Sequence, residues 1–194
     1  MESGSCTPRG ALRRALAHAL DQNPRAFCFE YEAHGRPYLA DESGHDGVSF
    51  SVSHSHDLAL IALTRGRRVG IDIERVRPEV DHEGLSRRFF SSVEYQALRS
   101  HHNGVRLRAF FAVWTRKEAL VKATGTGIAG GLKAFDVSAD PDRPAELLAT
   151  RWEDADQSNW LLTDICADPD YLACVASDGE TQVRCWTLAS AGRA

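Results

Sequence analysis

The spacing of apolar positions predicts three helices. Leucines at every fourth position indicate a short helix over 11–20. Ser91 followed by Glu94 is typical of a capping box and predicts that a helix begins there. The longest helical pattern covers 106–124 and ends at Gly125, a residue suited to a left-handed C-cap.

Alternating apolar positions predict the strands. Phe27, Phe29 and Tyr31 share one face of a first strand, and "GVSFSVSHSHD" reads as a second strand that stops at a Ser/His-rich loop. Two apolar runs around "RGR" predict a β-hairpin over 58–74. Four late strands are predicted, with a turn at 167–170 between the middle pair: 134–140, 159–166, 171–177 and 182–188. The order helix, strands, helices, strands favours an α+β fold over a doubly wound parallel sheet.

Composition narrows the class of protein. The 194 residues are 43% hydrophobic and 26% charged, as in an ordinary globular protein of one domain or two small halves. A net charge of -4 provides no overall basic field for nucleic acid. The five cysteines are odd in number and lack a C-x-x-C pair, which favours reduced thiols. Without a signal-like start or a long apolar run, we expect a cytoplasmic protein that does not enter a membrane.

Polar residues interrupt the apolar face of the longest predicted helix. Lys117 and Glu118 fall inside the apolar arc, and Lys122 lies one turn beyond Glu118 at its edge. One interpretation is a surface Glu118/Lys122 pair worth about 0.2–0.5 kcal/mol, with the Lys117 stem lying across apolar neighbours. The alternative is a carboxylate that faces inward, which requires a cation because an unpaired buried charge costs several kcal/mol.

A second acidic pair lies in "VGIDIE". Strand geometry puts Asp72 and Glu74 on one face, about 6.5–7 Å apart at Cα, with Ile71 and Ile73 on the other. Taken alone, this is also the pattern of a half-exposed strand. Combined with Glu118, it predicts an all-oxygen site, which selects Mg²⁺ over zinc and suggests a phosphate-bearing substrate.

The stretch "SVSHSHD" allows two interpretations. His54, His56 and Asp57 could form a transition-metal cluster, because alternate residues of an extended segment share a side. More often such a segment is solvated or offers donors to an anion. Both interpretations remain open at this point.

Five segments together resemble a known family. In order they are "GRPYLAD", "FSVSHS", "VGIDIERVRP", "RFFSSVEY" and "FFAVWTRKEALVKATGTGI". The chain resembles a 4'-phosphopantetheinyl transferase of the surfactin-synthetase-activating type from about Arg9 to about Trp186. The specific signal is G-[IV]-D-x-E followed some forty residues later by W-x-x-K-E-A-x-x-K.

The resemblance implies a holo-[carrier protein] synthase activity. Such an enzyme transfers phosphopantetheine from coenzyme A to a serine of an apo acyl or peptidyl carrier protein and releases adenosine 3',5'-bisphosphate. The implied roles are metal binding, catalysis and nucleotide binding. Metal ligands would be Asp72, Glu74 and Glu118, catalytic residues Glu118, Lys122 and Lys117, and nucleotide contacts Arg36, Ser53 and His54.

The resemblance also implies two pseudo-symmetric α+β halves with the active site between them. We expect an N-terminal half at 1–68, incomplete relative to the family, and a C-terminal half at 69–194 with the metal site and the catalytic helix. The segment 77–108 would help to dock the carrier protein. There, Arg87 and Arg88 could steer an acidic partner, while at least one of the adjacent phenylalanines belongs to the core.

Two other functions remain as alternatives. The chain could be a non-catalytic module that binds coenzyme A or a carrier protein, or a metal phosphohydrolase built around "HSHD". The sequence does not specify which carrier proteins are served, whether acylated coenzyme A is accepted, or the oligomeric state.

Overall fold

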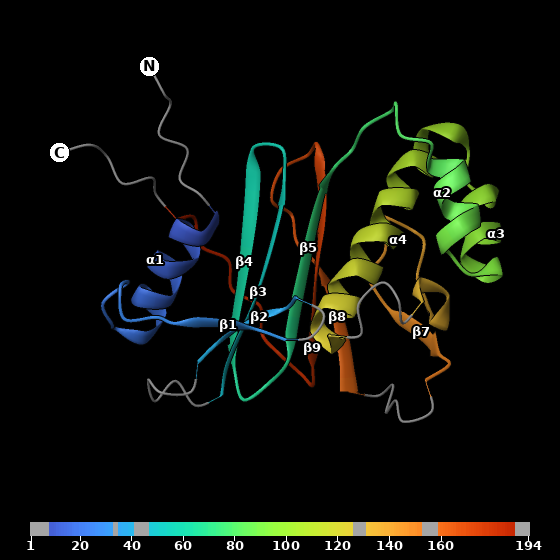
Figure 1. The fold of residues 1–194 in the computed structure, drawn as a ribbon. Helices are drawn as coiled ribbons and strands as arrows, with labels where there is room; N and C mark the ends of the chain where they lie inside the picture. Colours follow the sequence, from blue (N-terminus) through green and yellow to red (C-terminus); the bar gives the residue numbers. More distant parts are fainter. Residues whose placement is uncertain (1–7, 33–34, 41–46, 126–130, 153–158, 189–194) are drawn as a thin grey trace, which may run out of the picture.

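The chain folds as a mixture of helices and antiparallel strands. A computed structural model describes residues 8–32, 35–40, 47–125, 131–152 and 159–188. The elements in chain order are α1 (Pro8–Leu20), β1 (Phe29–Tyr31), β2 (Pro37–Leu39), β3 (Val48–Ser55), β4 (Leu58–Arg65), β5 (Val69–Arg75), α2 (His82–Phe89), α3 (Ser92–Ser100), α4 (Asn103–Thr124), the 3₁₀ turn η3 (Leu132–Ala134), β6 (Phe135–Val137), β7 (Leu147–Thr150), β8 (Trp160–Asp164) and β9 (Tyr171–Asp178). This order and the antiparallel pairing confirm the α+β class (Figure 1).

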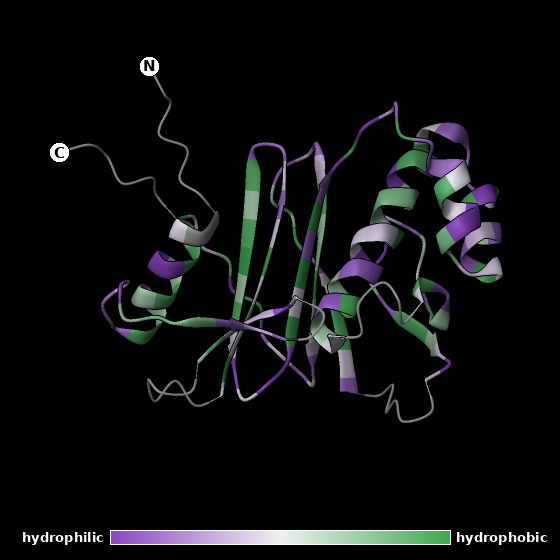
Figure 2. Cartoon of the chain, in the orientation of Figure 1, coloured by the Kyte–Doolittle hydropathy of each residue, from purple (hydrophilic) through white to green (hydrophobic). Residues whose placement is uncertain are grey.

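Strands β3 and β4 form a long hairpin beneath α1. Ser55 pairs with Leu58, so His56 and Asp57 form the tight turn, and His56 takes a positive φ of 51°. Buried leucines of α1 pack with apolar side chains of both strands. Figure 2 shows β4 as a nearly continuous hydrophobic strand. The Ser/His-rich stretch therefore belongs mostly to a strand, rather than to a loop that ends it.

Strand β5 belongs to a different sheet, with the strand order β5-β9-β8. The predicted hairpin over 58–74 is therefore wrong, because β4 pairs with β3 while β5 pairs with β9. Gly66 donates its N–H to the carbonyl of Gly47 at 2.6 Å, which closes the base of the β3–β4 hairpin before the chain crosses to the other sheet. The predicted hairpin of β8 and β9 across 167–170 is confirmed.

The predicted strand over 182–188 is also wrong. Within the described part of the chain, residues after β9 have no strand structure, and the Trp186 side chain is 83% exposed. The two edges of β9 are already paired with β5 and β8, so the segment that follows it finds no free edge there.

Helix α4 lies at the centre of the main core. It was predicted as an amphipathic helix, yet its buried residues lie on most of its sides. Polar positions interrupt it in its second half (Figure 2). It ends as predicted at Gly125, which takes a left-handed φ of 72° and donates its N–H to Val121. Arg116 is fully buried in this helix, where it pairs with Asp164.

The region between β5 and α4 contains two short helices. The capping box of Ser91 and Glu94 is present in α3, as predicted. Helix α2, capped by Asp81, was not predicted. Phe90 is buried and Phe89 is half-buried, which agrees with the expectation that at least one of them belongs to the core.

Two packing units can be distinguished among the described residues. In one, α1 covers the β3–β4 hairpin, and in the other α4 covers β5 and β9. The boundary between residues 68 and 69 stays a prediction. None of the helices in the described residues is both long and apolar enough to cross a bilayer.

Candidate active site

A glycine brings helix α4 onto the face of β5 that carries the acidic pair. A Cβ on Gly70 would lie 3.0 Å from Ala123 Cα and closer still to Ala119 O and Ala123 N, so only glycine allows this approach. Asp72 lies two residues along the same strand and faces the same way. The carboxylate on β5 therefore meets the polar residues of α4.

Asp72 is buried and holds the ammonium group of Lys122. Its Oδ1 accepts a hydrogen bond from Lys122 Nζ at 2.6 Å and another from the hydroxyl of Ser53 at 2.8 Å. Burial raises the pKa of Asp72, although Lys122 and Ser53 oppose the shift. Lys122 also donates to the carbonyl of Ile71, so its hydrogen-bond partners lie on β5. Of the two interpretations of Glu118 and Lys122, the surface pair is therefore not supported.

Glu118 lies close enough to Asp72, Glu74 and Lys122 for their charges to change its pKa. Burial raises its pKa, repulsion from Asp72 and Glu74 adds to the shift, and attraction to Lys122 opposes it. Among the described residues, Glu118 Oε1 and Asp72 Oδ2 are buried oxygens without a hydrogen-bond partner. Unpaired buried carboxylate oxygens are costly, which marks this place as one that favours a cation.

Glu74 lies near the C-terminal end of β5 and is half-buried. Its Oε2 accepts from the hydroxyl of Ser55 at 2.9 Å and lies 3.9 Å from the guanidinium of Arg77. Burial raises the pKa of Glu74; the Ser55 hydrogen bond opposes the shift, and the charge of Asp72 adds to it. Glu74 therefore has fewer close protein partners than Asp72, but it is also less buried.

The three carboxylates do not form a ready metal centre. Across the described ranges, no three His, Cys, Asp or Glu side chains are grouped so that they could hold a metal ion. Lys122 occupies Oδ1 of Asp72, and Glu74 is bound by Ser55. The donor set still fits Mg²⁺, because the unpartnered oxygens of Asp72 and Glu118 are hard ligands of the kind that this ion prefers.

Lys117 lies away from this cluster. Its ammonium group pairs with Glu94 of α3 at 2.6 Å, donates to the Phe135 carbonyl at 2.6 Å and lies over the Phe135 ring. Both charged side chains are at most 1% exposed. Burial lowers the pKa of Lys117, and the charge of Glu94 opposes that shift. These contacts give Lys117 a structural role and pair it with Glu94 rather than with the carboxylates of Asp72, Glu74 and Glu118, so they do not support the expected catalytic role.

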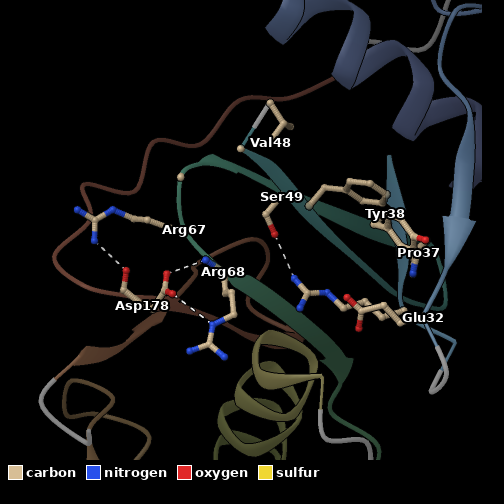
Figure 3. A pocket seen from close by; sticks show the side chains of 12 residues that line it. Glu32, Pro37, Tyr38, Val48, Ser49, Arg67, Arg68 and Asp178 are labelled. Atoms are coloured by element: carbon tan, nitrogen blue, oxygen red, sulfur yellow. Dashed lines mark hydrogen bonds and ion pairs between the residues drawn. The ribbon is translucent and has the colours of Figure 1, made fainter. Parts of the chain in front are cut away.

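Arg36, which follows β1 in the chain, contacts the C-terminal end of α4 and the start of β5. Its guanidinium donates to the carbonyls of Ala123 in α4 and Val69 in β5 and to the hydroxyl of Ser49. It also lines a cavity of about 390 Å³ whose wall includes two further arginines (Figure 3). Those arginines are Arg67 and Arg68, and both are tied to Asp178.

Ser53 and His54, both expected to contact the nucleotide, point to opposite sides of β3. His54 is exposed, while Ser53 is buried and points the other way, toward β5. The single O–H of Ser53 is already donated to Asp72. Sequence reasoning missed the parallel role of Ser55, although the alternation of serines in "FSVSHS" contained the signal.

Comparison with known proteins decides the family. A model of the 4'-phosphopantetheinyl transferase superfamily matches residues 68–176, which include β5, α4 and all the acidic residues of the site. The chain belongs to the 4'-phosphopantetheinyl transferase superfamily. The transferase HetI of Nostoc sp. is 39% identical over 171 residues, which are 88% of this chain and 69% of HetI.

Other members of the superfamily are matched over less of their length. A transferase of Bacillus subtilis is 30% identical over 68% of this chain and 56% of its own, and psf-1 of Bacillus pumilus is 39% identical over 70% and 56%. A solved holo-[acyl-carrier-protein] synthase of Thermotoga maritima aligns with a TM-score of 0.47 and 17% identity over 59% of this chain and 64% of that one. This structural likeness is too distant to refine the assignment.

Proposed function

We propose that the chain transfers the 4'-phosphopantetheine group of coenzyme A to a serine hydroxyl of an apo acyl or peptidyl carrier protein, in the manner of the surfactin-synthetase-activating type. The observation that carries the proposal is the meeting of Asp72, Glu118 and Lys122 at the contact of β5 with α4. The family assignment supports it, as does the similarity to the two Bacillus transferases.

The residues divide the chemistry between them. The carrier serine oxygen forms a new bond to the β-phosphorus of coenzyme A, and the bond to the bridging pyrophosphate oxygen breaks, which releases adenosine 3',5'-bisphosphate. Glu118, directly or through water, takes the serine proton. Lys122 neutralises charge on the phosphate oxygens.

Asp72 and Glu118, with Glu74 as the third ligand, would hold Mg²⁺ in this proposal. The ion would supply charge stabilisation at the phosphoryl oxygens. The cluster carries three carboxylates against Lys122 and the more distant Arg77, so a divalent cation would relieve a surplus of negative charge.

Arg36 is proposed to contact the nucleotide part of coenzyme A. Its cavity is large enough for part of a cofactor-sized ligand, and Arg67 and Arg68 contribute positive charge. His54 is exposed at the end of β3 and stays a proposed nucleotide contact. A cytoplasmic location and carrier docking through 77–108 likewise remain proposals.

Incubation with coenzyme A, Mg²⁺ and an apo carrier protein, followed by mass spectrometry of the carrier, tests the proposal. We expect one phosphopantetheine per carrier serine, and Glu118→Gln should lower the rate by about 10²-fold or more because it keeps shape and loses the base. Saturable coenzyme A binding without transfer would instead favour a binding module. Phosphate release without a carrier would favour a phosphohydrolase, and unchanged turnover by Glu118→Gln would contradict the assigned base.

A further inference from the structure

Three serines of β3 bridge to β5 across the boundary between the two sheets. The hydroxyls of Ser51, Ser53 and Ser55 accept hydrogen bonds from the backbone N–H groups of Ile71, Ile73 and Arg75, at 3.1, 3.3 and 3.1 Å. The contacts advance in step along both strands, so the strands run parallel here. Side-chain hydroxyls thus replace the carbonyls that would accept these N–H groups in a continuous sheet.

Two of these serines also contact the proposed metal ligands. Ser53 donates its O–H to Asp72 Oδ1 at 2.8 Å, and Ser55 donates to Glu74 Oε2 at 2.9 Å. Ser51 occupies the equivalent position beside Gly70, which has no side chain to accept its proton. All three serines therefore accept from a backbone N–H of β5, but only Ser53 and Ser55 also donate to a carboxylate.

The hydrogen bonds from Ser53 and Ser55 orient the carboxylates of Asp72 and Glu74. A serine hydroxyl can accept from a strand N–H and at the same time donate its own proton, so Ser53 and Ser55 each join a backbone group of β5 to a carboxylate. With Ser53 and Lys122 both on Oδ1, the other oxygen of Asp72 is the one left without a partner. Hydrogen bonds of this kind orient ligands, and their loss costs about 10–100-fold in metal affinity or activity.

We propose that Ser53 and Ser55 are positioning residues of the transferase site: each ties a backbone N–H of β5 to a carboxylate that would bind the metal. The inference rests on the proposed function. It assigns the Ser53 hydroxyl to Asp72 rather than to the nucleotide. Ser55 has the weaker effect, because Glu74 is more exposed and also has Arg77 nearby.

Four variants test the proposal: Ser51→Ala, Ser53→Ala, Ser55→Ala and Ser53→Thr. Mn²⁺ binding in the presence of coenzyme A is followed by electron paramagnetic resonance, and the Mg²⁺ dependence of transfer is compared with KM for coenzyme A. We expect Ser53→Ala to weaken Mn²⁺ binding by about tenfold, with a smaller loss for Ser55→Ala. The KM for coenzyme A should change by less than about twofold. Ser53→Thr retains the hydroxyl and should restore binding.

Ser51→Ala is the matched control. It removes the equivalent backbone contact without touching a carboxylate, so its loss of stability in urea measures the cost of that contact alone, while its Mn²⁺ affinity stays at the parent value. Equal losses of metal affinity at Ser51 and Ser53 would reduce the bridge to a structural role and overturn the proposal. A higher KM for coenzyme A with unchanged Mn²⁺ binding would show that Ser53 contacts the nucleotide, which also overturns it.

The parent protein separates the two hypotheses. A parent that binds Mn²⁺ but transfers nothing refutes the proposed function, and the positioning role is then decided by the Mn²⁺ affinities of the variants alone. A parent that transfers phosphopantetheine while the Ser51 and Ser53 variants behave alike refutes only the positioning role. A parent that does not bind Mn²⁺ overturns the positioning role.

Discussion

Gly70→Ala should separate helix α4 from strand β5 and thereby weaken the site. An added Cβ would lie 3.0 Å from Ala123 Cα and nearer still to Ala119 O and Ala123 N, all backbone atoms that cannot rotate away. Because carbon contacts are optimal at about 3.5–4.0 Å, the helix must retreat by on the order of 1 Å. Overpacking of this kind costs about 1–3 kcal/mol in the free energy of unfolding.

The same displacement moves Glu118 and Lys122 away from Asp72. A misplacement of about 1 Å is sufficient to cost about 10²-fold in rate, so turnover should fall well beyond what the loss of stability explains. Equilibrium unfolding in urea measures the stability, and phosphopantetheine transfer by the folded fraction measures the rate. Both are determined on the same preparation.

Gly104→Ala on α4 is the control for the glycine substitution itself. A Cβ there would contact only the His102 ring, at 3.7 Å or more, so the variant should keep parent turnover and gain less than about 1 kcal/mol from helix propensity. A Gly70→Ala protein with parent stability and parent turnover would refute the close approach of α4 to β5.

Three further outcomes are expected. Lys122→Ala should lower the transfer rate by about 10²–10³-fold, and a rate within a few fold of the parent would remove this lysine from the mechanism. Lys117→Met should cost about 3–5 kcal/mol in urea unfolding because it leaves a buried carboxylate unpaired, while the folded fraction keeps its turnover; a selective loss of turnover would restore the catalytic role. Burial raises the pKa of Asp136, but hydrogen bonds from Arg151 and Ser91 outweigh it and hold that pKa below its usual 3.8. This stabilisation is present above the unfolded pKa and is lost as pH falls through the folded one, so the stability deficit of Asp136→Asn should shrink from pH 7 toward pH 3; a constant deficit would contradict the ion pair.

Local sequence patterns correctly predicted those parts of the fold that depend on contacts between residues close in the chain. The capping box at Ser91, the C-cap at Gly125 and the turn at 167–170 depend on neighbouring residues and are confirmed. The hairpin over 58–74 was wrong because the partner of β5 is β9, about a hundred residues later, and no local signal identifies it.

Part of the candidate site was also accessible from the sequence. The motif around Asp72 and the motif around Glu118 indicated that distant carboxylates would meet. Burial is the main cause of the raised pKa of Glu118, and repulsion from the nearby Asp72 adds to it. The contribution of Gly70 was missed, since the cost of a Cβ depends on a helix that the pattern cannot place. The serine bridge was missed for the same reason: its acceptors and donors belong to two strands that are not paired in one sheet.

Lys117 and Glu118 show why periodicity alone could not assign the polar residues of α4. Both fall inside the apolar arc of the helix, so the sequence treats them alike. In the fold, Lys117 is fully buried and meets a carboxylate and a carbonyl, which satisfies its charge within the protein. Glu118 keeps a buried oxygen without a partner beside another carboxylate, and a fold gains nothing from that arrangement. Burial itself therefore does not distinguish Lys117 from Glu118. What distinguishes them is that the charge of Lys117 is satisfied within the protein, while Glu118 keeps an unpartnered oxygen, which supports our proposal that it binds a metal.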